Sequence, residues 1–188
     1  MKDNLFLERP SIVRKSAAID FINEFKRCNS DTDGDGGLDR YLDDYEGWLK
    51  KIENDRNTVP SEEKVPAETY FLIRESDKKI IGMCNIRLAL NKKLIELNAW
   101  HIGYCVRPTE RRKGYAKKML YLALKECKKY NLKEVIIGCD KDNIGSSKTI
   151  TSFSSKLIKE YMDTKYYNCI QQQFSIDVDK ALGQYKDN

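Results

Sequence analysis

Residues 106–120, VRPTERRKGYAKKML, combine residue types that bind an anion. A proline stands where a strand would end, a basic turn follows, and then an amphipathic pattern predicts a helix. Within the turn, Arg111, Gly114 and Ala116 have the spacing R-x-x-G-x-A. The first turn of a helix leaves backbone N–H groups without internal partners, and these groups favour phosphate. The segment is a candidate phosphate site, although a solvated basic turn explains so short a motif equally simply.

Two other phosphate-binding motifs do not fit this turn. A dinucleotide-binding turn has G-x-G-x-x-G and a P-loop has G-x-x-x-x-G-K-[ST], and neither spacing occurs here. Gly114 would instead let a ligand approach the backbone, and the small Ala116 would let the helix start pack closely. Arg111, Arg112 and Lys113 add positive charge where a diphosphate would lie.

An acidic segment, DTDGDGGLDRYL at residues 31–42, is similar to a calcium-binding EF-hand loop in its first half. Asp31, Asp33 and Asp35 alternate as such a loop requires, but its twelfth position needs a bidentate glutamate and here is Leu42. We therefore expect no metal site. A solvated, flexible connection is the alternative for the first half of this segment.

The bulk composition is that of one globular domain, residues 1–188, with 40% hydrophobic and 34% charged residues and a net charge of +5. Six scattered cysteines without a C-x-x-C pair, and the lack of a signal-peptide pattern, favour the cytoplasm. No apolar run approaches the ~20 residues of a membrane span. The lysines of residues 116–129 are dispersed as on a solvated face, so we expect neither a membrane nor a nucleic acid as partner.

Hydrophobic periodicity predicts a mixed α/β sheet flanked by helices. An acidic loop at residues 31–44 joins the first two helices, residues 55–67 form a polar loop, and residues 91–97 form a short connection. Residues 178–188 are predicted to be a C-terminal tail. The predicted strands are residues 4–10, 69–75, 80–90, 99–106, 133–140, 155–163 and 169–177, and the predicted helices are residues 15–28, 38–54, 114–131 and 143–153.

Taken together, HIGYCVRPTERRKGYAKKML, EVIIGCD and DNIGSSKTI resemble the GNAT superfamily of N-acetyltransferases. The resemblance covers about residues 4–177. It implies a single-domain α/β (α+β) fold with a mixed, mostly antiparallel central sheet and about four flanking helices. It also implies that the sheet is splayed open where the cofactor enters.

The resemblance implies acetyl-CoA as co-substrate, with its diphosphate on the backbone amides of the R-x-x-G-x-A turn and its pantetheine arm beside the preceding strand. Asn143 would contact pantetheine, although it also suits the N-cap of a helix, and Lys148 would reach a phosphate. The implied cofactor-binding residues are Tyr104, Cys105, Val106, Arg111, Arg112, Lys113, Gly114, Tyr115, Ala116, Lys117, Asn143, Ser146 and Lys148.

The implied reaction is direct attack of an amine on the thioester, with a backbone N–H near Tyr104 or Cys105 stabilising the oxyanion. The usual tyrosine acid, seven residues after Asn143, is replaced by Ile150. His101 and Tyr104 are the candidate catalytic side chains, although His101 also suits a structural role and most tyrosines simply pack. An acyl-cysteine at Cys105 is disfavoured because a lone strand cysteine is more often a buried small apolar residue and no histidine is paired with it.

The resemblance places the acceptor beside the segment that joins the first two helices. Here Leu38, Asp39, Arg40 and Tyr41 are the candidate substrate-binding residues, in a locally acidic sequence that would attract a cationic amine. The acceptor is then a small-molecule or peptide amine, with protein lysine also open. A homodimer would fit the family, and a non-catalytic acyl-CoA-binding regulatory module is the alternative function.

Overall fold

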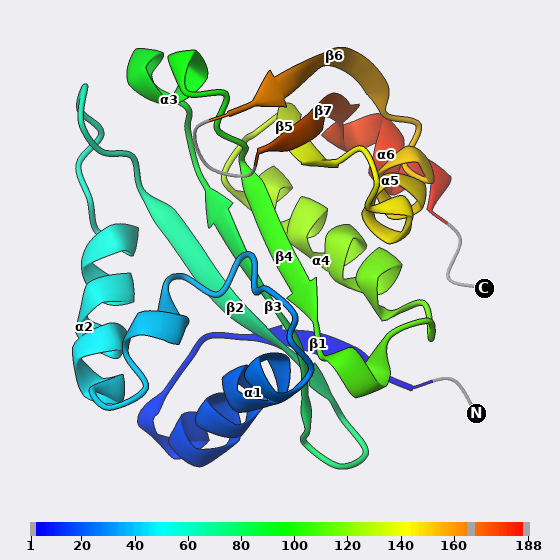
Figure 1. Cartoon of the computed structure of the whole chain (residues 1–188). Coiled ribbons are helices and arrows are strands. Elements are labelled where there is room, and N and C mark those ends of the chain that lie inside the picture. Colours follow the sequence, from blue (N-terminus) through cyan, green and yellow to red (C-terminus); the bar gives the residue numbers. More distant parts are fainter. Residues whose placement is uncertain (1–2, 165–167, 186–188) are drawn as a thin grey trace.

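A computed structural model describes residues 3–164 and 168–185. Its centre is a seven-stranded sheet with strand order β1-β2-β3-β4-β5-β7-β6. All neighbouring strands are antiparallel except β4 and β5, so the expected mixed, mostly antiparallel sheet is confirmed (Figure 1). The strands are β1 (Leu5–Glu8), β2 (Ala67–Arg74), β3 (Ile80–Arg87), β4 (Ile102–Val106), β5 (Glu134–Asp140), β6 (Lys156–Asp163) and β7 (Cys169–Asp177).

The described residues contain six α-helices, two more than the sequence predicted. Each is too short or too polar to cross a membrane. One addition, α3, lies in the predicted short connection, and the other, α6, lies in the predicted C-terminal tail, where Val178 and Ala181 are buried. The helices are α1 (Lys15–Arg27), α2 (Tyr45–Arg56), α3 (Lys92–Glu96), α4 (Tyr115–Lys129), α5 (Ile144–Thr151) and α6 (Val178–Gln184).

The second helix begins later than its hydrophobic pattern predicts. Residues Leu38–Arg40 form a separate 3-10 turn, η2, and α2 starts only at Tyr45. The reason is local hydrogen bonding, because the Asp44 carboxylate accepts from the N–H of Gly47 and caps the new helix. The apolar residues of both segments still enter the same core cluster, which explains the continuous pattern.

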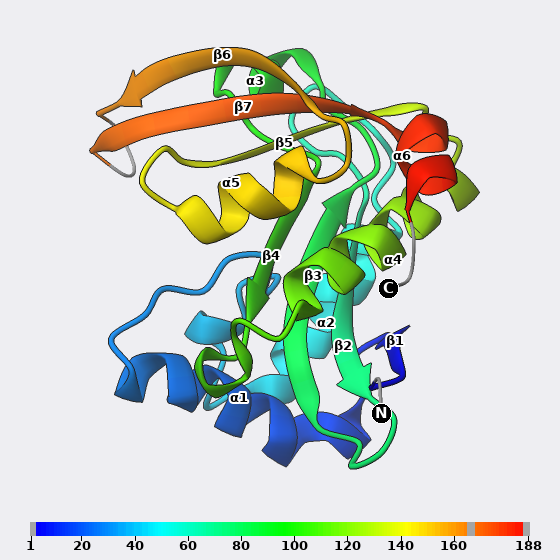
Figure 2. The ribbon, with the colours of Figure 1, turned by 90° about the vertical axis from the view of Figure 1, so that its right-hand side faces the viewer.

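Helices cover both faces of the sheet (Figure 2). On one face, α4 packs Met119, Leu120 and Leu124 into a core shared with β5 and β7. On the other face, α1 and α2 pack Phe21 and Trp48 onto β2 and β3. Both clusters lie around β3 and β4, so these two central strands are fixed from above and below.

The parallel strands β4 and β5 pair at one point only. The ladder between them consists of Ile102 opposite Ile137, while β3 pairs with β4 over all five positions from Ile102 to Val106. The expected splay of the sheet is therefore present, and it leaves the rest of β4 without a strand partner on its β5 side.

A buried ion-pair network holds the end of β4 to α1. The guanidinium of Arg107, which is 3% exposed, donates to the carboxylate of Glu24 at 2.6 Å and to the carbonyl of Ile80 at 2.8 Å. The second carboxylate oxygen of Glu24 accepts from the backbone N–H and the hydroxyl of Thr109. The turn after β4 is thus fixed before α4 begins.

We predict that Arg107→Ala lowers the free energy of unfolding by about 3 kcal/mol or more, because it leaves Glu24 buried without its cation. Urea unfolding measures the change. Arg56→Ala, which removes a more exposed pair with Glu53, should cost about 1 kcal/mol at most. A similar small cost for both variants would contradict the network's importance.

The pH dependence of this network has a defined sign. Burial alone would raise the pKa of the Glu24 carboxyl, but hydrogen bonds from Thr109 and Arg107 outweigh it and lower the pKa. The stabilisation is therefore present above the ordinary value of 4.5 and is lost as the pH falls below it. In the wild type, Glu24 should contribute to this acid-side loss of stability, and the loss should be smaller in Glu24→Gln.

Candidate functional site

The backbone of β4 presents hydrogen-bonding groups toward the opening beside β5. The N–H of Arg87 donates to His101 O and the N–H of Arg107 donates to Ile81 O, which fixes the alternation of the ladder between β3 and β4. By that alternation Cys105 bonds to β3, whereas the backbone groups of Tyr104 and Val106 point away from β3. The backbone of Tyr104 is therefore directed into the splay.

The N-terminus of α4 is open to an anion. Gly114 occupies the N-cap position at φ 80°, no side chain caps the helix, and its first turn contains no acidic residue. A Cβ atom built on Gly114 would meet no atom within 4 Å, so the space in front of the backbone is free. The unpaired N–H groups of this turn and the helix dipole suit a diphosphate.

The basic side chains of the turn are partly committed to the protein. Lys113 pairs with the buried Glu110 at 2.7 Å, and Arg111 donates to Val106 O and to Ser30 Oγ and packs on the Phe25 ring. Arg112 is exposed, with φ 66°. The side chains of Arg111 and Lys113 are therefore less available to an anion than the backbone amides of this turn.

Two predicted cofactor-binding residues of α4 have side chains that pack within the protein. Tyr115 is buried, and its hydroxyl donates to Asp3, while Ala116 packs against the core beside α4. The ammonium of Lys117 lies over the ring of Tyr185. Of the three, only Lys117 extends a polar side chain from the exposed surface of the first helical turn.

The start of α5 brings a second hydroxyl beside Tyr104. The Asn143 side chain accepts from the N–H of Ser146, which confirms it as an N-cap, and Lys148 is exposed on the same helix. The hydroxyls of Ser146 and Tyr104 are 2.9 Å apart. Burial raises the pKa of Tyr104 to about 12, so its phenol keeps its proton at neutral pH.

Ile150, which stands at the family's tyrosine position, is fully buried in the core. The structure therefore places a tyrosine hydroxyl against α5 from β4 instead of from α5 itself.

His101 is held as a structural residue. Its ring Nδ1 accepts from the backbone N–H of Ile136. The backbone N–H of His101 donates to Ile136 O, and together these two bonds join β4 to β5. Desolvation lowers its pKa to about 4, so the ring is neutral at pH 7 and its remaining Nε2 carries the proton. This geometry is unfavourable for the predicted role of His101 as a base.

Cys105 is equally unsuited to nucleophilic chemistry. Its thiol is buried and packs in the core on the α1–α2 face, and burial raises its pKa well above the usual range. A protonated, enclosed thiol does not attack a thioester. The predicted role of Cys105 in the cofactor site can therefore involve only its position on strand β4 and not its thiol.

The first half of the acidic loop packs on β4 (Figure 1), while Asp31 and Asp33 remain exposed, as in the alternative of a solvated connection. A Cβ atom on Gly34 would lie 2.1 Å from Gly103 O, and one on Gly103 would lie 2.6 Å from Asp33 Oδ1. Two glycines thus allow two backbones to touch. Asp33 as a residue is exposed, yet its carboxyl lies close against Gly103, and desolvation there raises its pKa to about 6.

The sequence contained one signal for this contact that its interpretation missed. An isolated glycine within a strand pattern, here Gly103, often marks the close approach of another backbone. The partner could not be found from sequence, because residues 34 and 103 are far apart in the chain. Asp33 was considered only as a metal ligand.

The predicted acceptor residues are placed differently. Leu38 is fully buried in the core, while Asp39 and Arg40 are exposed and Tyr41 is half-buried. They lie toward α2, because the carbonyl of the preceding Gly36 accepts from Trp48 and Lys51 of that helix. The fold thus brings residues 33–34, rather than Leu38, against β4.

Asp35 organises the loop from within. Its carboxylate accepts from the hydroxyl of Thr32 and from the N–H groups of Gly37 and Asp39. Across residues 3–164 and 168–185, no group of three or more acidic, cysteine or histidine side chains has an arrangement that could hold a metal ion.

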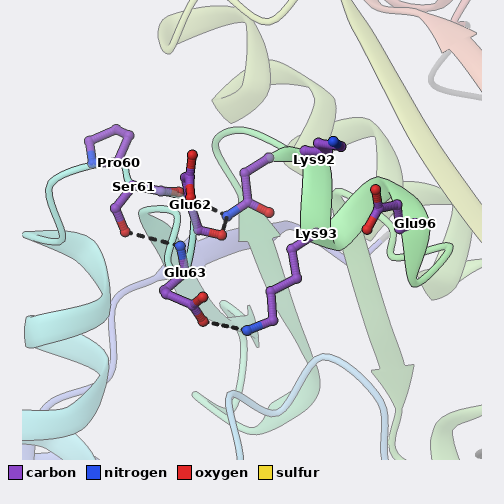
Figure 3. A pocket seen from close by; sticks show the side chains of 8 residues that line it. Pro60, Ser61, Glu62, Glu63, Lys92, Lys93 and Glu96 are labelled. Carbon is purple, nitrogen blue, oxygen red and sulfur yellow. Dashed lines mark hydrogen bonds and ion pairs between the residues drawn. The ribbon is translucent and has the colours of Figure 1, made fainter.

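A surface hollow of about 540 Å³ lies between the loop after α2 and helix α3 (Figure 3). Its wall includes the ion pair of Lys93 with Glu63 and the bonds of Asn91 to the carbonyls of Ser61 and Glu62. None of its lining residues belongs to β4, β5 or the basic turn, so it is separate from the site described above.

The sequence profile of the acetyltransferase (GNAT) family matches residues 20–150, which include the acidic loop, β4, the basic turn and most of α5. The chain belongs to the GNAT acetyltransferase family. No curated protein matched it in a sequence comparison. The family assignment therefore rests on the profile, and solved structures add the fold.

Two solved structures illustrate that fold. RimL, a ribosomal L7/L12 alpha-N-protein acetyltransferase in complex with coenzyme A, is 15% identical, with 94% of this chain and 95% of RimL covered and a TM-score of 0.67. The spermidine/spermine N-acetyltransferase SpeG from Vibrio cholerae is 13% identical, with 97% and 98% covered and a TM-score of 0.68. At such identities they support a common GNAT fold for this chain.

We predict that Gly34→Ala destabilises the protein by about 1–3 kcal/mol, because alanine is strained at φ 69° and its Cβ meets the β4 backbone. Thermal unfolding measures the loss. Gly183→Ala on α6, where a Cβ meets nothing within 4 Å, is the matched control and should be neutral or stabilising. Equal stability of the two variants would show that the loop does not dock on β4.

Proposed function

We propose that this acetyltransferase moves the acetyl group of acetyl-CoA to a primary amine by direct attack within a ternary complex. Acetyl-CoA is the co-substrate of its family. The observation that carries the proposal is the coincidence of the β4–β5 splay, the inward-facing backbone of Tyr104 and the uncapped start of α4. Together they form a polar edge leading to an anion site, which fits an extended thioester that ends in a diphosphate.

The reaction needs a donor for the oxyanion that forms on the thioester carbonyl. The ladder with β3 uses the N–H of Cys105 and leaves that of Tyr104 directed into the splay. We therefore assign the oxyanion to the Tyr104 N–H, of the two donors considered from sequence. Because this donor is fixed by a paired strand, little reorganisation is needed when charge develops.

The leaving thiolate needs a proton, and the Tyr104 hydroxyl is the group proposed to supply it. Its elevated pKa keeps it protonated, and Ser146 at 2.9 Å can accept or return a hydrogen bond as the charge changes. As the amine nitrogen attacks, the carbon–sulfur bond breaks and the products are an acetamide and the free thiol of coenzyme A.

The acceptor is proposed to be a cationic primary amine of a small molecule or a peptide. RimL and SpeG are named for an alpha-amino group of a ribosomal protein and for spermidine/spermine, so both kinds of acceptor occur on this fold. Asp33, Asp39 and the neighbouring acids give the α1–α2 connection a negative field that would attract such an amine. The alternative is a non-catalytic acyl-CoA-binding module.

Acetyl-CoA should raise the melting temperature, and Gly114→Glu should abolish that rise, because a carboxylate would occupy the free space before the α4 amides. Gly183→Glu introduces the same charge at an exposed position of α6 and should keep the full rise. Thermal-shift titration measures both variants. Retention of the rise in Gly114→Glu would contradict the proposed diphosphate site.

Release of free coenzyme A thiol should depend on an amine when the protein is tested with spermidine, glycinamide, free amino acids and short peptides. Tyr104→Phe should lower kcat by about 100-fold while leaving acetyl-CoA affinity nearly unchanged, since it removes a proton donor and no backbone group. Tight binding of acetyl-CoA with no transfer to any amine would support the regulatory alternative.

A further inference from the structure

The Asp33 carboxylate lies at the mouth of the splay on the face opposite α4. Ile102 and Tyr104 contact the α4-side core, so Gly103 between them points to the other face, where Asp33 Oδ1 lies against it. Gly34 holds the loop there by touching the Gly103 carbonyl. Asp33 is therefore adjacent to the residue whose N–H faces the thioester in the proposed reaction.

A second carboxylate faces the same region from β5. The pairing of Ile102 with Ile137 sets Gly103 level with Gly138, so Asp140 lies two residues further along and on the same face as Gly138. The negative charge of Asp140 contributes to the raised pKa of Asp33. The two carboxylates thus lie on either side of the splay. Along the strands, Asp33 lies at the level of the residue before Tyr104 and Asp140 at the level of the residue after it.

A buried polar group beside Asp140 has unused hydrogen-bonding capacity. Gln171 on β7, opposite Asp140, is fully buried, and its Nε2 donates to Asp140 Oδ1 at 2.6 Å. Within the part of the chain that the structure describes, its Oε1 has no hydrogen-bond partner. An unpaired buried acceptor is costly, and a cationic donor that reached Oε1 while bound at Asp140 would offset that cost.

We propose that Asp33 is the catalytic base, which binds the ammonium group of the acceptor together with Asp140 and removes its proton before attack. The inference rests on the proposed function and names a residue for its first step. The ammonium nitrogen gives one proton to Asp33 and its freed lone pair bonds to the acetyl carbon. As the carbon–sulfur bond breaks, the thiolate gains a proton from Tyr104, the second proton of the nitrogen passes through solvent to the tyrosinate so formed, and Asp33 then releases the first proton to solvent.

The environment of Asp33 suits this task. Desolvation and the charges of Asp35 and Asp140 disfavour the carboxylate, while Arg87 and the N–H of Gly34 favour it, and the balance sets a pKa of about 6. Two further ionisable groups interact electrostatically with Asp33, Tyr104 and Cys105, and both are neutral at pH 7 because burial raises their pKa values. Asp33 is thus ionised at neutral pH and is a stronger base than an ordinary aspartate.

The experiment compares Asp33→Asn with Asp31→Asn, an exposed acid two residues earlier in the same loop. The probe amines are spermidine and glycinamide, and kcat/KM is measured from pH 5 to 9. Asp33→Asn should lower kcat/KM by about 100-fold and remove the inflection near pH 6, while its melting-temperature rise with acetyl-CoA stays unchanged. Asp31→Asn removes the same charge from the loop but no base, so it should change kcat/KM by no more than about threefold and keep the inflection near pH 6.

Retention of kcat/KM within threefold in Asp33→Asn, or of the pH 6 inflection, would overturn the assignment. The same loss in Asp39→Asn but not in Asp33→Asn would also overturn it, in favour of the η2 segment. These outcomes leave the proposed acetyl transfer itself intact, because the wild type still acetylates the probe amines.

A second measurement separates this inference from the proposed function. Carbon NMR of the Asp33 carboxyl, assigned through Asp33→Asn, should show its pKa falling when spermidine or glycinamide is added with coenzyme A, because a bound ammonium stabilises the carboxylate. If the wild type acetylates neither amine, the proposed acetyl transfer to these two classes of amine is wrong. If, in addition, neither amine changes the Asp33 resonance, the Asp33 assignment is wrong as well.

Discussion

The functional arrangement depends on the loss of pairing between β4 and β5 after Ile102 and Ile137. Parallel strands that continued to pair would consume the backbone groups of Tyr104 and Val106 and close the site. Because pairing stops, β4 has one edge bonded to β3 and one edge that no described strand covers, where the Val106 carbonyl accepts from Arg111. The uncapped start of α4 follows this free edge, α5 approaches it with Ser146, and the acidic loop covers its opposite face.

An open edge must be held rigidly to be useful, and buried acids do this on both sides of the turn after β4. Glu24 ties Arg107 and Thr109 to α1, and Glu110 collects Arg74, Lys79 and Lys113. Burial would raise the pKa of Glu110, but its three cations lower it to about 2. Both carboxylates therefore stay ionised at neutral pH, and the position of the α4 amides is fixed without using those amides.

Much of the architecture followed from the sequence because strong periodicity and the R-x-x-G-x-A turn are local signals. The sheet, α1 and α4 were predicted from such signals, the splay was implied by the family resemblance, and the family profile confirms that resemblance. The start of α2 was predicted too early, since an apolar pattern does not show where Asp44 would cap. Helix α6 was missed because its few buried residues form a short, weak pattern.

The site was only partly predictable, because its decisive contacts join residues far apart in the chain. His101 had a suitable residue type, but only the fold shows that Ile136 uses its Nδ1. Asp33 was judged as a metal ligand, and only the contact of Gly34 with Gly103 places it against the splayed strand β4. Charge and composition drew attention to the acidic loop without showing which of its acids faces β4.

Amide hydrogen exchange with and without acetyl-CoA tests the central claim most directly. If the thioester arm occupies the free edge of β4, the amides of Tyr104, Val106 and the first turn of α4 should exchange more slowly in its presence. Cys105, already bonded to β3, should change little. Binding that raises the melting temperature yet leaves exchange at Tyr104 and Val106 unaltered would show that acetyl-CoA lies elsewhere and would contradict the account.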